Sequence, residues 1–187
     1  MYTIYILTLS VRRHLLDNAA EYASPFIQQL VDFTVQIPFV LQIFAVALWS
    51  MIPFVESDAG AFIGVIVGIP VIPAVIAAIV GNWLAVMGIV ILTHKIRAWL
   101  YKQKDTDAKA TIMSKKEEKV RHAVKKYGIP GASLLGPILI GTHLNAFFMA
   151  AAGADKRYLM IWQTIAITIW GIISGTIAYL VLEVMKT

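Results

Sequence analysis

Three long apolar stretches of the chain predict membrane-spanning helices. Residues 31–52, 71–93 and 158–184 supply 22, 23 and 27 residues, and a helix needs roughly 20 apolar residues to cross a bilayer. Pro38 lies inside the first stretch and predicts a kink there. We therefore expect an all-α polytopic membrane protein with about three full transmembrane helices.

A fourth apolar stretch, residues 53–70, is interrupted by polar and helix-breaking residues. It reads PFVESDAGAFIGVIVGIP, and Gly60, Gly64 and Gly68 would line one helix face and permit close approach by another helix. From Gly60 to Ile69 a helix would rise about 15 Å, half of a hydrocarbon core of about 30 Å. We expect a half-helix that enters the membrane and turns back, which is tolerated only where protein or a water-filled cavity covers it.

Residues 127–154 have the same character, with glycines and prolines between apolar residues and a polar cluster at Thr142, His143 and Asn145. We expect a second re-entrant hairpin here. Two hairpin-plus-span units of opposite orientation would form an inverted repeat, and transporters with such repeats hold their substrate site at the repeat interface.

Basic residues are concentrated between two of these membrane units. Of the 16 Lys and Arg residues, 11 lie between Lys95 and Lys126, and short cytoplasmic loops carry such an excess. We expect a plasma-membrane protein of bacterial or archaeal type. The expected parts are an N-terminal interfacial region (1–30), a first membrane unit (31–93), a cytoplasmic loop (94–126) and a second membrane unit (127–187).

Composition supports this class. The 187 residues are 59% hydrophobic and 14% charged, too apolar for an ordinary soluble domain. The basic loop is explained by membrane orientation, so we expect no nucleic-acid partner. No phosphate-binding glycine loop and no nucleophile with a neighbouring base are present, so we expect neither an enzyme nor a cofactor.

Glu56 and Asp58 are the first candidates for functional chemistry. A charge at the bilayer centre costs roughly 2.5 to 3.5 kcal/mol on insertion scales, and intramembrane acids usually face a protein or water interior. In a helix the two side chains would diverge, whereas in an extended hairpin tip they would share a side. Burial favours the protonated form of a carboxyl, so one of the pair would suit a proton-coupled carrier.

The remaining candidates are neutral or weakly basic. Asn82 either ties its span to a neighbouring helix or helps to form a substrate cavity, since an unsatisfied amide in hydrocarbon is costly. His143 is either a hydrogen-bonded packing residue or a proton relay partner of Glu56. Substrate or proton binding is thus predicted for Glu56, Asp58, Asn82, Thr142, His143 and Asn145.

Two alternatives remain for these residues and for the glycine motifs. Carboxylates, imidazole and amide together suit a divalent ion, but no clustered ligand spacing supports a metal site. Gly171 and Gly175 repeat the GxxxG spacing in the last span. They predict either packing within the chain or a homodimer, and the small size of the membrane part favours a dimer.

Several motifs together resemble the putative small multidrug export protein family, which is distantly similar to the DedA-type membrane proteins. The resemblance covers roughly residues 50–178. The similar segments are MIPFVE at 51–56, VGN at 80–82, KYG at 126–128 with the stretch to Pro137, Gly141-Thr142 and Ala150-Ala151.

The resemblance carries Glu56, Asn82, Gly141 and Thr142 over to this chain as site residues. Two departures exclude Asp58 and His143 from that transfer. The family commonly has an acid followed by Leu-Arg where this chain reads Glu56-Ser57-Asp58, and Pro-x-Pro-Gly-Thr-Gly where it reads PILIGTH at 137–143.

The residues and the resemblance favour a small proton-coupled exporter of amphipathic substrates. The DedA resemblance implies an alternative, the movement of lipid phosphates such as the undecaprenyl carrier. A membrane scaffold without transport activity is the second alternative, with the glycine faces packed against partners and the acids at helix starts.

Overall fold

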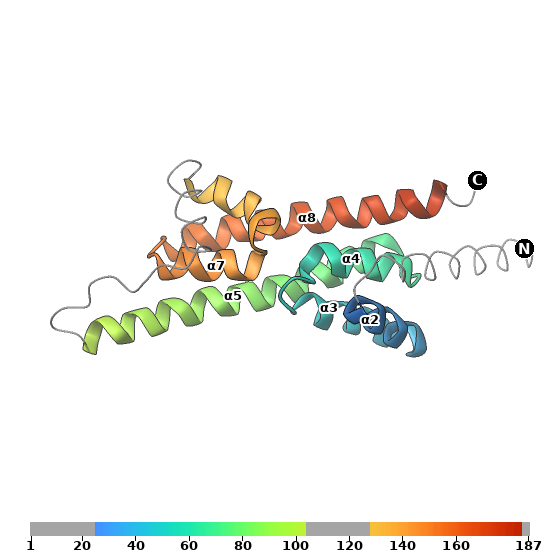
Figure 1. The fold of residues 1–187 in the computed structure, drawn as a ribbon, viewed down its shortest axis with the longest axis horizontal. Helices are drawn as coiled ribbons and strands as arrows, with labels where there is room; N and C mark the ends of the chain where they lie inside the picture. The colour runs from blue at the N-terminus through green and yellow to red at the C-terminus, as the bar shows by residue number, and fades with distance from the viewer. Residues whose placement is uncertain (1–24, 104–127, 185–187) are drawn as a thin grey trace, which may run out of the picture. The chain divides into compact units, whose positions relative to one another are not determined.

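A computed structural model describes residues 25–103 and 128–184 of the chain. All regular structure in these two ranges is helical, and the termini and the intervening residues 104–127 lie outside the description (Figure 1). A short apolar helix, Gly128–Leu139, precedes α7. The labelled helices are α2 (Pro25–Gln36), α3 (Phe39–Ser50), α4 (Glu56–Ile66), α5 (Val71–Gln103), α7 (Thr142–Ala151) and α8 (Lys156–Val184).

Two of the described helices are long and apolar enough to cross a membrane. These are the 29-residue segments Val71–Trp99 of α5 and Lys156–Val184 of α8. At 1.5 Å per residue each rises more than 40 Å. The second and third predicted spans therefore correspond to membrane-length helices, and α5 continues past its predicted end at Thr93 to Gln103.

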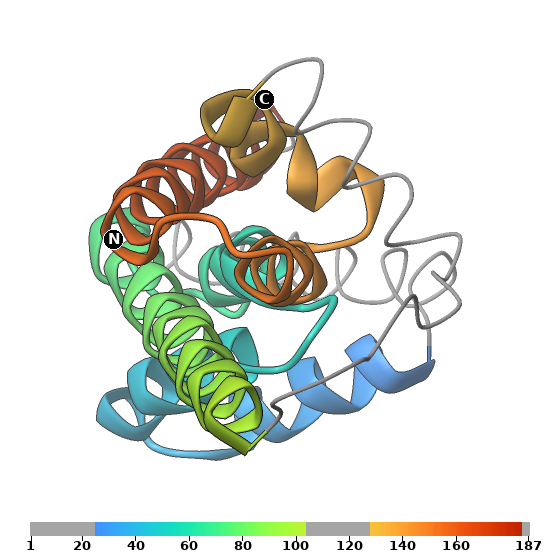
Figure 2. The same ribbon diagram turned by 90° about the vertical axis from the view of Figure 1, so that its left-hand side faces the viewer.

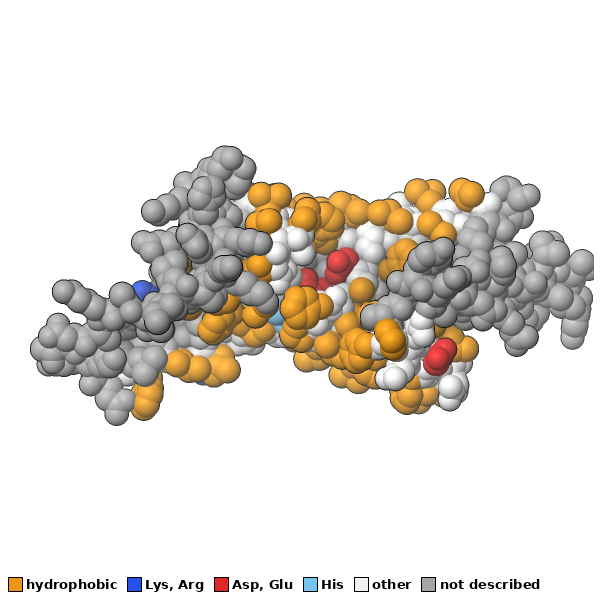
Figure 3. Space-filling view, in the orientation of Figure 1, with side chains coloured by type: hydrophobic (Ala, Val, Ile, Leu, Met, Phe, Trp, Pro, Cys, Tyr) orange, Lys and Arg blue, Asp and Glu red, His pale blue; other side chains and the backbone are white. Residues whose placement is uncertain are grey.

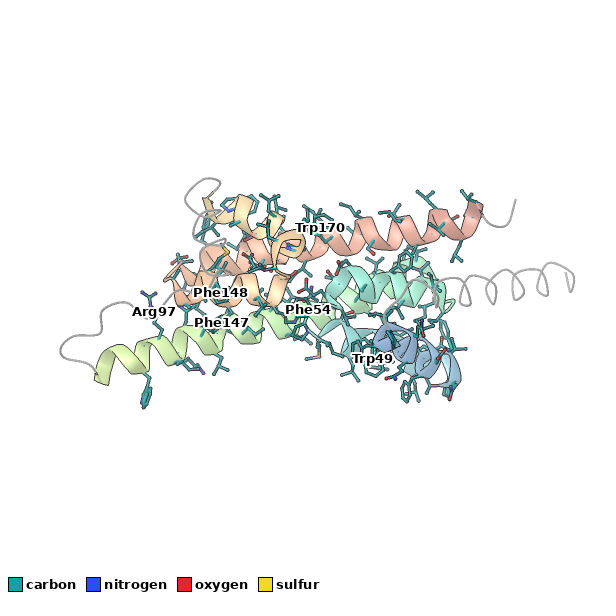
Figure 4. The ribbon with its side chains drawn as sticks, viewed as in Figure 1. Trp49, Phe54, Arg97, Phe147, Phe148 and Trp170 are labelled. Carbon is teal, nitrogen blue, oxygen red and sulfur yellow. The ribbon has the colours of Figure 1, made fainter. Side chains whose placement is uncertain are left out.

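The prediction that residues 31–52 form one continuous spanning helix is wrong. The indole nitrogen of Trp49 on α3 donates to the hydroxyl of Thr34 on α2 at 3.0 Å, and Trp49 also packs edge-on against Phe33 with ring centroids 5.7 Å apart (Figure 4). Fifteen residues of straight helix would separate these positions by about 22 Å, so the chain reverses between them.

Pro38 is the physical reason why the helix is interrupted before this reversal. Proline has no N–H for the helix ladder, and its ring disfavours helical backbone at the preceding residue. The helix stops at Gln36 and restarts at Phe39, and the side chain of Gln42 donates to the carbonyl of Ile37 at 3.1 Å. Residues 25–103 and 128–184 thus contain two membrane-length helices, where the pattern predicted three in the chain.

The chain divides into two compact units. The first comprises Met1–Ser50, Val55–Gly81 and Trp170–Thr187, and the second comprises Met51–Phe54 and Asn82–Ile169. Each long helix therefore contributes one half to each unit. The membrane units expected along the chain stay a prediction.

In the first unit, α4 packs through its glycine face, as close helix contacts require. A Cβ on Gly60 would meet Ser50 of α3 and Ala78 of α5, and one on Gly64 would meet Val46 of α3 and Ala74 of α5. Figure 2 shows α4 beside these helices. Gly68, the third glycine of the run, lies beyond α4 and ends it with a φ of 103°.

The glycines of α8 also contact helices of their own chain. A Cβ on Gly171 would meet Ile79 of α5 and Ser57 of α4, and one on Gly175 would clash with Val75 of α5. Of the two interpretations left open by the GxxxG spacing, the described contacts correspond to packing within the chain.

In the second unit, residues 128–151 form a helical hairpin. The amide of Asn145 on α7 donates to the carbonyl of Ala132 at 3.1 Å, and a Cβ on Gly136 would clash with Asn145. Gly141 turns the chain between the two short helices with a φ of 86°. A hairpin therefore stands where one was predicted, while its re-entrant placement in a bilayer and the inverted repeat stay predictions.

The C-terminus of α7 is closed by Gly153, whose φ is 90°. A Cβ on this glycine would clash with the guanidinium of Arg97, which projects from α5 (Figure 4). A cation at this position interacts favourably with the carbonyl end of a helix.

Apolar side chains cover much of the described surface, as a lipid-facing surface requires (Figure 3). Among them are Phe44 at 63%, Ile72 at 72% and Leu92 at 58% exposure. The predicted interfacial region up to Ser24 and residues 104–126 of the predicted cytoplasmic loop lie outside the described residues.

Candidate functional site

The first turn of α4 has an unusual backbone. Phe54 and Glu56 are the non-glycine residues with positive φ among the described parts of the chain, at 74° and 54°. Such conformations cost of order 1–3 kcal/mol each and cluster at functional sites. The chain enters α4 through this turn, so the strain lies directly at the candidate acid.

Glu56 is buried, with 4% of its surface exposed, and Asp58 is half-buried. Both belong to the first turn of α4, but Glu56 enters that turn with a left-handed backbone, so ideal helix geometry does not fix the angle between the two side chains. The two carboxyls remain within electrostatic range of each other.

Helix α8 holds this turn in place. The hydroxyl of Ser174 donates to the main-chain carbonyl of Asp58 at 2.6 Å, and Gly171 allows α8 to approach Ser57. The acidic turn is thus attached to one of the two membrane-length helices.

The second unit contains the other candidates, and three of them form the first turn of α7. Thr142, His143 and Asn145 are 2%, 3% and 2% exposed. Asn145 has a structural role, since it ties α7 to the Gly128–Leu139 helix. The turn begins directly after Gly141, whose positive φ only glycine adopts without strain.

Asn82 is fully buried on α5, and neither atom of its amide has a hydrogen-bond partner among the described residues. Leaving a buried polar group unsatisfied costs about 1–3 kcal/mol. The sequence allowed two roles for Asn82, a tie to a neighbouring helix or a part in a substrate cavity. Among the described residues its amide makes no hydrogen bond to a neighbouring helix.

Sequence reasoning missed Gln163, which is also fully buried. Its amide nitrogen lies 3.4 Å from the hydroxyl of Ser133 and 3.9 Å from the sulfur of Met149, and its amide oxygen has no hydrogen-bond partner in the described segments. Gln163 lies on α8 four residues after Leu159 and four before Ile167, both of which are buried and apolar. That i, i+4 spacing would have indicated a buried polar position.

The candidates therefore fall into two sets. Glu56 and Asp58 belong to the first compact unit, and Asn82, Thr142, His143 and Asn145 belong to the second. The pairing of Glu56 with His143 stays a prediction. Within residues 25–103 and 128–184, no three His, Cys, Asp or Glu residues are grouped as metal ligands would be.

The described residues are helical wherever they are regular, and two of their apolar helices are long enough to cross a membrane, as an integral membrane protein requires. The family described as "Putative small multi-drug export protein" matches residues 56–173, more than half of the chain, and the chain belongs to that family. The match begins at Glu56 and includes Asn82 and Gln163. No curated protein and no solved structure matches the chain.

Proposed function

We propose that this protein is a small secondary transporter that exports an amphipathic substrate in exchange for protons. Membership of an export family supports the transport role. The two membrane-length helices support a membrane location. The absence of a GxxxxGK[ST] motif from the sequence favours an ion gradient over ATP as the energy source.

The observation that carries the proton role is the buried carboxyl of Glu56 in a strained turn. Acids in apolar surroundings are rare and functional by default. Such a carboxyl gains or loses a proton when its surroundings change between dry and wet. Glu56 is 4% exposed and adopts a φ of 54°, so a conformational change in this turn would alter both its hydration and its backbone strain.

Asp58 complements Glu56 in this proposal. Two acids lie in the first turn of α4, and their negative charge would attract a cationic amphipathic substrate more than an anionic one. Asp58, being half-buried, is the more accessible of the pair. It would receive the cation, and Glu56 would exchange the proton.

The test compares Glu56→Gln with Asp32→Asn, a matched change at an exposed acid on α2. Both variants and the unaltered protein are reconstituted in vesicles, and ethidium movement driven by a pH gradient is measured. We expect Glu56→Gln to abolish the proton-driven movement and Asp32→Asn to preserve it. Retained transport by a folded Glu56→Gln protein would refute the proton role.

Movement of a lipid phosphate is the second candidate, and a basic cluster in the second unit favours it. His94 lies within electrostatic range of two basic residues, Arg97 and Lys156, and of one acid, Asp155, so basic groups outnumber acids near this histidine. A fluorescent isoprenoid phosphate in the same vesicles tests this role. Its translocation, lost on Arg97→Gln and retained on Glu56→Gln, would favour the phosphate over the cation.

A scaffold without transport activity is supported less well. Its main argument was a glycine face available to a partner, whereas Gly171 and Gly175 contact α4 and α5 of the same chain. A homodimer stays part of the proposal on grounds of size, with other surfaces as its interface. We propose no enzymatic activity.

A further inference from the structure

Two buried amides of the second unit have hydrogen-bonding capacity that the described protein does not use. Asn82 and Gln163 are each 0% exposed. Both amide atoms of Asn82 and the amide oxygen of Gln163 lack a hydrogen-bond partner within the described residues. Buried side-chain polar atoms nearly always have a partner, so each exception calls for a physical explanation.

Both amides lie on inward-facing sides of their helices, next to a contact between α5 and α8. The indole nitrogen of Trp83 on α5 donates to the hydroxyl of Thr164 on α8 at 2.9 Å, at the exposed edge of that contact. Asn82 and Gln163 directly precede these two residues. The amides are therefore on neighbouring helices of the same unit.

Buried apolar residues continue both faces. Val86 and Val90 follow Asn82 at intervals of four residues on α5, and Leu159 and Ile167 flank Gln163 at the same interval on α8. Each amide is thus the polar position of an otherwise apolar inward stripe.

Two more helices, Gly128–Leu139 and α7, place polar or polarisable atoms next to Gln163. Its amide nitrogen faces the hydroxyl of Ser133, which is 0% exposed on the Gly128–Leu139 helix. The sulfur of Met149 on α7 lies 3.9 Å from the same nitrogen. Four helical segments of one unit therefore contribute to a polar region inside an apolar structure.

The chemistry of the unused atoms restricts the ligand. The amide nitrogen of Asn82 offers donors, and the amide oxygens of Asn82 and Gln163 offer acceptors. A carboxylate or phosphate only accepts and would leave both oxygens unpaired. An ammonium group only donates and would leave the nitrogen of Asn82 unpaired. A hydroxyl group both donates and accepts.

We infer that Asn82 and Gln163 form a hydrated site for a neutral hydroxyl-bearing group, occupied by water when no substrate hydroxyl is bound. Water satisfies buried polar groups in this way where a site is polar enough to hold it. Its use for a substrate hydroxyl rests on the proposed transport function. The site would supply uncharged hydrogen bonds, whereas Glu56 and Asp58 supply charge.

The test uses the absence of cysteine from the sequence. Asn82→Cys and Gln163→Cys are made in the full chain, reconstituted in vesicles and treated with the small water-soluble reagent 2-aminoethyl methanethiosulfonate. Val86→Cys and Ala166→Cys are matched controls, since both residues are also 0% exposed on the same two helices.

We expect positions 82 and 163 to react at least about tenfold faster than positions 86 and 166, because the thiolate is the reactive form and water promotes its formation. Equal and slow labelling at all four positions would overturn the inference. Asn82→Leu provides an independent measurement if a cysteine variant fails to fold. A higher Tm for Asn82→Leu would mean a dry, unsatisfied amide and would contradict the site, whereas a lower Tm supports it.

These measurements do not depend on transport. Fast labelling at 82 and 163 with no effect of Glu56→Gln on ethidium movement would leave the hydrated site in place and refute the proton role. Loss of ethidium movement in Glu56→Gln, together with unreactive cysteines at 82 and 163, would support the proton role and overturn the hydrated site.

Discussion

The hydroxyl of Ser174 on α8 donates a 2.6 Å hydrogen bond to the main-chain carbonyl of Asp58 in the first turn of α4. The two residues are 116 positions apart in the sequence. The bond is part-buried and joins a membrane-length helix to the turn that carries the two candidate acids. A rearrangement of that turn would therefore have to break or move this bond.

Replacing Ser174 by Ala should destabilise the protein by about 0.5–1.5 kcal/mol, the usual net contribution of one such bond. The measurement is the thermal midpoint in detergent, with Thr176→Ala at an exposed position of the same helix as the control. If the bond restrains the acidic turn, Ser174→Ala should also change the rate of proton-driven ethidium movement. Identical midpoints for the two variants would contradict the stabilising role of Ser174.

Two glycines of α5 should respond in opposite directions to the same substitution. A Cβ on Gly81 would clash with the backbone carbonyl of Ala47, whereas one on Gly88 has nothing within 4 Å. Gly81→Ala should therefore cost about 1–3 kcal/mol by overpacking. Gly88→Ala should stabilise by about 0.5–1 kcal/mol through helix propensity.

Thermal midpoints of these two variants provide the comparison. Similar midpoints would mean that α3 and α5 do not approach as closely at Gly81 as the structure indicates. The pair is informative because both positions lie in α5 and each substitution adds one methyl group.

The fold-back of α2 on α3 depends on Thr34, which accepts from Trp49 at 3.0 Å and donates to the carbonyl of Leu30 at 2.6 Å. Thr34→Val should cost about 1–3 kcal/mol, because it leaves the indole N–H of Trp49 without its acceptor. Thr34→Ser retains the hydroxyl and should restore most of the loss. A Thr34→Val protein as stable as the original would indicate that α2 and α3 do not pair in solution.

The spanning of the membrane by α8 can be tested with cysteines at its two ends. Asp155 and Val184 are both exposed, Val184 at 71%. Because Lys156 and Arg157 follow Asp155, the positive-inside rule predicts that this end is cytoplasmic. Asp155→Cys should react with an impermeant thiol reagent only from the cytoplasmic side, and Val184→Cys only from the other side.

Labelling of both positions from one side would mean that α8 does not cross the bilayer. Cysteines in the two predicted hairpins would suit this measurement less well, because Ser57 and Ser133 are only 2% and 0% exposed. The same reagent can be applied to oriented vesicles of each variant.

Local properties of the sequence determined the helical class, the two long spans and the breaks after α4 and before α7. Apolar length predicts a span because the bilayer thickness is constant. Breakers act on their immediate neighbours, so Gly68 with Pro70 ended α4 and Gly141 opened α7 where the pattern indicated a turn. Burial of Glu56, Asn82, His143 and Asn145 was also expected, since polar groups in apolar stretches are sheltered by protein.

Only the tertiary structure decided which faces meet. Pro38 predicted a kink, but the contact of Trp49 with Thr34 made it a reversal, because the angle depends on side chains fifteen residues apart. The GxxxG spacing was compatible with packing within the chain and with a dimer, and only the structure placed Ile79 and Val75 against Gly171 and Gly175. The spacing of Gln163 with Leu159 and Ile167 indicates an inward-facing position, but its neighbours Ser133 and Met149 come from other helices and could not be predicted from that spacing. Periodicity reports one helix at a time, whereas these contacts depend on how several helices pack.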